Sequence, residues 1–68
     1  MTPERREMIR SHLRAVKCEQ ELDGFARGLA HQGELADDVV TLELVGALER
    51  FGLRTVEAQR NWWRGLRG

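Results

Sequence analysis

Apolar residues in the first half of the chain recur at the spacing of an amphipathic helix. At about 100° per residue they fall on one side of that helix, and the set comprises Met8, Ala15, Cys18, Leu22, Phe25, Ala26 and Leu29. Thr2 can cap the first free amide groups, and Pro3 suits the first helical position. Gly33 is suited to the left-handed conformation that often follows a helix. The pattern therefore predicts one helix over residues 3–31.

A second apolar stripe follows after a short connection at residues 32–37. Asp37 or Asp38 can cap a new helix. The apolar stripe after them again keeps helical spacing and comprises Val40, Leu44, Leu48, Phe51, Thr55, Ala58 and Trp62. This predicts a second helix over residues 38–65. Two long helices joined by a short turn form an antiparallel hairpin, so we expect one all-α helical-hairpin domain over residues 1–68.

Both predicted helices are apolar on more than one side. Beside the main stripes stand Ile9, Leu13 and Val16 in the first helix, and Leu42, Val45, Leu53, Val56 and Trp63 in the second. A helix with one neighbour needs an apolar stripe of about 100°, and a wider stripe indicates further neighbours. We therefore expect two hairpins to assemble as a homodimeric four-helix bundle. Its dimer core would comprise Leu22, Phe25, Leu29, Leu44, Leu48, Phe51 and Trp62.

Glycines inside the predicted helices leave one alternative open. Gly24 and Gly28 lie one turn apart in the first helix, and Gly46 and Gly52 lie in the second. Each costs about 1 kcal/mol relative to Ala in a helix interior. They are either tolerated on the polar side or they break the helix. A break between Gly24 and Gly28 would give three helices instead of two.

The charged residues cancel in sum but are sorted along the chain. Residues 1–18 and 50–68 hold ten basic and three acidic residues, whereas residues 19–49 hold one basic and eight acidic residues. In a hairpin both termini would form a positive pole and the turn a negative pole. Antiparallel packing of two hairpins would place opposite poles side by side, although parallel packing stays open. Exposed ion pairs contribute only about 0–1 kcal/mol each, so apolar burial would supply the stability.

The sequence carries no signature of catalysis or of a metal site. His12 and His31 are nineteen residues apart, and neither lies three or four residues from Cys18. No glycine-rich phosphate loop or hydrolase motif is present. We expect a protein that is not an enzyme and needs no cofactor or metal. A lone cysteine and the lack of a long apolar segment favour a cytoplasmic protein without membrane contact.

The surplus apolar surface beside arginines favours binding to another protein. Trp, Arg and large apolar side chains are the common anchors of protein interfaces. The predicted partner-binding patch comprises Ile9, Arg10, Leu13, Arg14, Val16, Leu53, Val56, Arg60, Trp63 and Arg64. Its partner would be a larger protein with an acidic or amphipathic surface. The chain would then act as a regulator, adaptor or inhibitor, roles that small proteins of phages and mobile elements also fill.

Nucleic-acid binding is the alternative function. The basic pole combines Trp62 and Trp63 with arginines that could neutralise phosphates, namely Arg5, Arg6, Arg10, Arg14, Arg60, Arg64 and Arg67. The expected architecture is similar in shape to the Rop family of small RNA-binding helical hairpins, although no motif residues match. A net charge of zero argues against a dedicated nucleic-acid binder.

Overall fold

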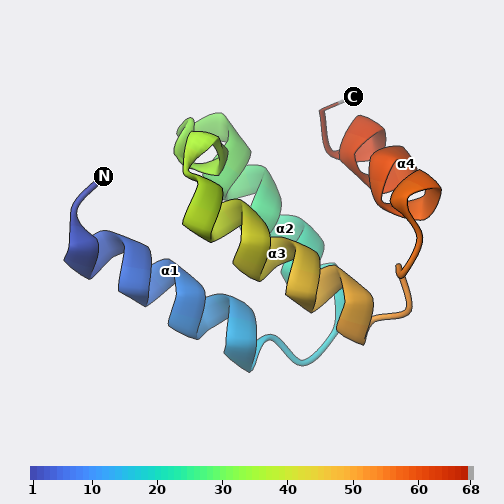
Figure 1. Ribbon diagram of the computed structural model, residues 1–68, viewed down its shortest axis with the longest axis horizontal. Coiled ribbons are helices and arrows are strands. Elements are labelled where there is room, and N and C mark those ends of the chain that lie inside the picture. The colour runs from blue at the N-terminus through green and yellow to red at the C-terminus, as the bar shows by residue number, and fades with distance from the viewer. Residues whose placement is uncertain (68) are drawn as a thin grey trace.

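The first predicted helix is interrupted at residues 16–18. The computed structural model describes residues 1–67, and in it α1 spans Pro3–Ala15 while α2 spans Glu19–His31 (Figure 1). Val16 and Cys18 between them have extended backbone conformations. The break has a physical reason. At about 100° per residue, Leu13 and Leu22 would lie on opposite sides of one straight helix, and both side chains are fully buried.

The second predicted helix is interrupted at residues 51–55. It forms α3, Asp38–Arg50, and α4, Val56–Arg67, and the short 3-10 helix η1, Glu34–Ala36, precedes it. Gly52 adopts φ +91°, and the amide groups of Gly52 and Leu53 donate to Glu49 O and Leu48 O at 3.1 and 3.0 Å. This pattern is a Schellman motif, which ends a helix at a left-handed residue. The Thr55 hydroxyl then accepts from the Ala58 amide at 3.0 Å and caps α4.

The expected two-helix hairpin and its homodimeric bundle are therefore wrong. The chain is all-α, as predicted, but the described residues form four α-helices packed into a compact monomeric globule of 31 × 23 × 19 Å. The residues assigned to a dimer core lie in the core of the single chain. Leu22, Leu29, Leu44 and Leu48 are buried there, and Phe25, Phe51 and Trp62 pack against it. Shorter helices cover one another's apolar sides, whereas two straight rods would leave them exposed.

Helices α1 and α3 run parallel, and ion pairs join them (Figure 1). On the apolar side, Ile9 and Leu13 of α1 are buried in the core together with Leu44 of α3. Bidentate hydrogen bonds of 2.7 and 2.8 Å link Arg5 to Glu34. The other links between α1 and the acidic segment are Arg6 to Asp37 at 2.7 Å, Arg10 to Glu43 at 3.1 Å and Arg14 to Glu43 at 2.9 Å. We expected these charges to form ion pairs between two copies of the chain, but they form ion pairs within one chain.

The alternative of a helix break between Gly24 and Gly28 does not occur, because α2 is continuous through both glycines. A Cβ added at Gly24 would meet nothing within 4 Å. Gly24→Ala should therefore raise the free energy of unfolding by up to about 1 kcal/mol, the gain in helix propensity. Gly52→Ala should lower it by about 1 kcal/mol, because alanine is strained at positive φ. Urea denaturation measures both, and a destabilising Gly24→Ala would contradict the helical assignment.

Hydrogen bonds from arginine lower the pKa values of three carboxyl groups. The hydrogen bond from Arg5 lowers the pKa of Glu34, and the hydrogen bond from Arg6 lowers the pKa of Asp37. Burial raises the pKa of Glu43, but hydrogen bonds from the two α1 arginines beside it outweigh burial and lower it overall. Because the folded pKa values lie below the unfolded ones, the charged forms stabilise the fold. That contribution is complete above the unfolded pKa values and is lost as the pH falls through the folded ones.

The urea midpoint should therefore stay level from neutral pH down to about 5 and then fall as the pH drops below about 4.5. Asp37→Asn supplies the control. Asp37 also caps α3 by accepting from the amides of Val39 and Val40 at 3.0 and 3.1 Å, and Asn can keep that role. The variant should be less stable than wild type at pH 7, and the difference should shrink towards pH 2. Parallel pH profiles for the two proteins would contradict the assigned ion pair.

Candidate functional site

The structure places the predicted partner-binding residues in two different environments. Ile9, Leu13 and Val16 are buried in the core and do not reach the surface. Arg10 and Arg14 lie at the surface, but both contact the carboxylate of Glu43. The half of the predicted patch that belongs to α1 is therefore occupied by contacts within the chain.

The other half of the patch lies on α4 and on the connection before it. Arg60 and Arg64 are exposed and stand one helical turn apart, so they are neighbours on the helix surface. Val56, 65% exposed, starts the same face. Leu66 is buried and anchors the opposite side of α4 to the core. Helix α4 therefore presents an arginine face to solvent.

Trp63 stands at the border between the arginine face and the body of the protein. It is half-buried and packs against the core, and its ring contacts Trp62 edge to face, with centroids 5.7 Å apart. Trp62 is also half-buried and also packs against the core. Of the two adjacent tryptophans, Trp63 is the one that lines an open pocket.

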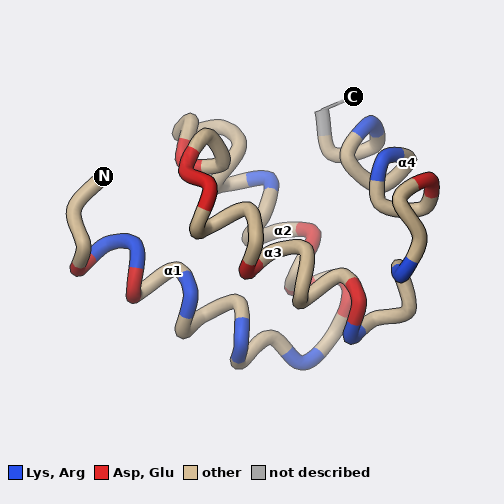
Figure 2. Tube along the Cα trace, in the orientation of Figure 1, with Lys and Arg blue, Asp and Glu red and all other residues tan. Residues whose placement is uncertain are grey.

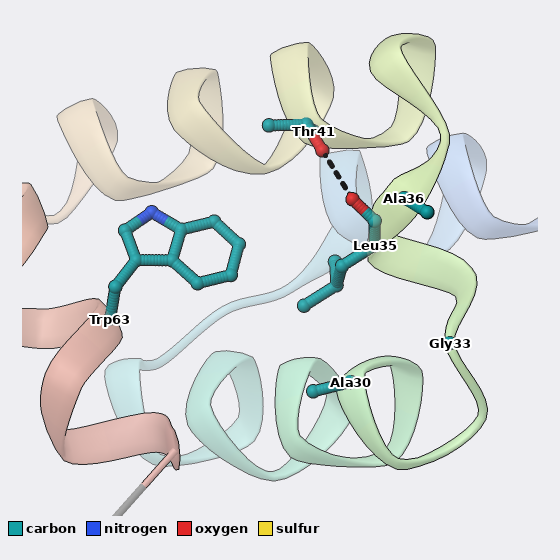
Figure 3. Close-up of a pocket in the computed structure, with 6 residues that line it drawn as sticks. All are labelled: Ala30, Gly33, Leu35, Ala36, Thr41 and Trp63. Carbon is teal, nitrogen blue, oxygen red and sulfur yellow. Dashed lines mark hydrogen bonds between the residues drawn. The ribbon is translucent and has the colours of Figure 1, made fainter.

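That pocket is a groove of about 490 Å³ between α2, η1, α3 and α4. We call it the Trp63 groove, and its lining residues are Ala30, Gly33, Leu35, Ala36, Thr41 and Trp63. Figure 3 shows the indole of Trp63 at one end of the groove, facing the Leu35 side chain across it. The Thr41 hydroxyl donates to Leu35 O at 2.9 Å and joins α3 to η1. Sequence reasoning found Trp63 but missed the other five residues, of which all but Leu35 are small or polar.

The arginines of the C-terminal segment differ from those of α1 in their partners. Arg50 donates to the carbonyl oxygens of Leu13 and Arg14 at the end of α1. Arg54 donates to Glu49 O at 3.5 Å, and the described contacts of Arg64 include the side-chain oxygen of Asn61 at 3.4 Å.

Within residues 1–66, no carboxylate lies within 4 Å of Arg50, Arg54, Arg60 or Arg64. The predicted contribution of the Arg67 side chain lies outside the described residues. Figure 2 shows α4 and the connection before it on the opposite side of α3 from α1. Positive charge without an internal partner is therefore concentrated on α4 and on the connection before it.

The remaining reactive side chains lie apart from one another. The His12 ring stacks on Phe25 with centroids 3.9 Å apart, and Cys18 is a free, exposed thiol at the start of α2. In the part of the chain that the structure describes, no three His, Cys, Asp or Glu side chains are grouped to hold a metal ion. No described helix is both long and apolar enough to cross a membrane.

The Trp63 groove and the arginine face beside it are the features that can bind a partner. The groove offers apolar contact, and the arginines offer charge-assisted hydrogen bonds to an anionic group. No protein-family model, curated protein or solved structure matches this chain, so its site is interpreted from its own geometry.

Proposed function

We propose that this protein acts without enzymatic chemistry, by binding another protein through the Trp63 groove, and so serves as a regulator, adaptor or inhibitor. The observation that carries the proposal is a half-buried tryptophan that lines an open groove next to exposed arginines. Trp and Arg are the residues most often found at the energetic centres of protein interfaces. The groove is concave, and such sites bury more of a bound side chain than a flat surface does.

Nucleic-acid binding is the second candidate, and it is favoured by the four C-terminal arginines that have no carboxylate of residues 1–66 within 4 Å. Two observations weigh against it. The arginines of α1 are neutralised by Glu34, Asp37 and Glu43 and cannot add to a phosphate-binding surface. The Trp63 ring is half-buried and lines a groove formed with three other elements, so it is not a freely exposed stacking platform.

Site-specific photocrosslinking in the native host tests the proposal. A photoreactive amino acid at Ala36, which is exposed and lines the groove, should give a discrete protein adduct. The same amino acid at Gln20, exposed at the start of α2, is the matched control and should not give that adduct. Identical adducts from both positions, or an adduct that contains nucleic acid, would contradict binding of a protein in the groove.

A further inference from the structure

We infer that the segment bound in the Trp63 groove is an amphipathic helix with acidic residues along one side of its apolar stripe. This inference rests on the proposed function, because it names the chemistry of the partner at the same site. Three features carry it: the hydrogen bonding around the groove, the size of its lining residues and the charge of its border.

The groove offers a partner few backbone hydrogen bonds. The carbonyl of Leu35 already accepts from the Thr41 hydroxyl, and the amides of Ala36 and Asp37 donate to Gly33 O and Glu34 O at 3.4 Å. The described residues contain no strand whose edge could pair with an extended peptide. A bound segment must therefore satisfy its own backbone groups, as a helix does.

The lining residues let such a helix approach closely. Ala30, Gly33 and Ala36 are small, and Leu35 and Trp63 supply the larger apolar surfaces at the sides. A helix that lies in such a groove inserts apolar side chains from positions i, i+3 or i+4, and i+7. A volume of about 490 Å³ holds a few of these side chains and no larger part of a domain.

The border of the groove selects the charge of the partner. Arg60 and Arg64 are exposed, and Arg60 stands three residues before Trp63, so these two side chains are neighbours on the surface of α4. Neither arginine has a carboxylate of residues 1–66 within 4 Å. An anion on the partner can therefore bind without displacing an internal ion pair. Asp or Glu residues one turn apart on a partner helix would match the spacing of the two arginines.

Selection from a library of random 16-residue peptides displayed on phage tests the inference. Peptides that bind the immobilised protein should combine apolar residues at helical spacing with a surplus of Asp and Glu. Arg60→Glu combined with Arg64→Glu should weaken the selected peptides at least about fivefold, because two exposed attractions become repulsions. Lys17→Glu is the matched control, since Lys17 is exposed, does not line the groove and changes the charge equally per site.

A second pair of variants distinguishes binding in the groove from the acidic character of the partner. Trp63→Ala should abolish peptide binding, but Trp63 also packs against the core. Ala30→Trp obstructs the groove from an exposed position, and circular dichroism shows whether both variants stay folded. Peptide binding could be lost in these two variants and yet not depend on peptide charge or on Arg60 and Arg64. That result would overturn the acidic character of the partner and would leave the groove as the binding site. Binding that ignores Trp63 and Ala30 would overturn both.

An oligonucleotide completes the test. A single-stranded 20-mer DNA is titrated against the protein with a bound selected peptide, and peptide displacement is followed by fluorescence anisotropy. No displacement at 150 mM salt is expected. Displacement at micromolar DNA that is lost in the double arginine variant would assign the arginines to phosphate binding and overturn the inference.

Discussion

Leu44→Ala is expected to lower the free energy of unfolding by about 3–4 kcal/mol, the typical cost of deleting a large apolar side chain from a packed core. Leu44 is 0% exposed and lies on α3, the helix that packs against α1 and η1. A chain of 68 residues has a small core, and such domains often have only about 3–5 kcal/mol of stability. The variant should therefore be largely unfolded at 25 °C.

Leu42→Ala is the matched control, two residues away on the same helix. Leu42 is 72% exposed, so its truncation should change stability by no more than about 0.5 kcal/mol. Urea denaturation followed by far-ultraviolet circular dichroism measures both variants. Equal losses in the two variants would show that α3 does not bury Leu44 as described.

Glu43→Ala is expected to lower the free energy of unfolding by about 1–2 kcal/mol, the range for hydrogen bonds to a charged group. The Glu43 side chain is 20% exposed and accepts from the Nε atoms of both Arg10 and Arg14 at 3.1 Å. Its removal leaves two neighbouring guanidinium groups without the shared carboxylate. The arginine side chains are 33% and 52% exposed, so solvent screening keeps the loss at this modest level.

Glu49→Ala is the control for Glu43→Ala. Glu49 lies on the same helix and is exposed, and its carboxylate forms no ion pair with a described residue. A double-mutant cycle sharpens the test, because Arg14→Ala should cost clearly less in the Glu43→Ala background than in wild type. A cost that is the same in both backgrounds would contradict the ion pair between α1 and α3.

Both predictions concern the contact of α1 with α3, which gives the charge sorting of the sequence its structural role. Arg5 and Arg6 meet η1 and the start of α3, and Arg50 reaches back to the carbonyls that end α1. The N-terminal basic segment and the acidic middle segment thus neutralise each other within one chain. Arg54, Arg60 and Arg64 have no such acidic counterpart among residues 1–66, and this asymmetry leads to the proposed acidic partner.

Helix initiation and termination could be predicted from the sequence because these signals act over a few residues. Thr2 accepts from the Arg5 amide at 3.1 Å and caps α1, and Asp37 caps α3. Gly33 adopts φ +73° after α2, as its position predicted. Each of these roles depends on one side chain or one missing Cβ atom. The all-α class followed from the same local signals and from the helical spacing of apolar residues.

The break at residues 16–18 and the Trp63 groove were decided by the tertiary structure. No proline or glycine lies between Ala15 and Glu19 to mark the break, and it forms because Leu13 and Leu22 must both enter one core. The groove combines residues within the range 30–41 with Trp63 of α4, which is distant from them in the sequence. Local propensity and periodicity determined where helices begin and which apolar residues can be buried. Only the packing of the helices against one another decided which apolar surfaces are covered, since burial depends on contacts between distant segments.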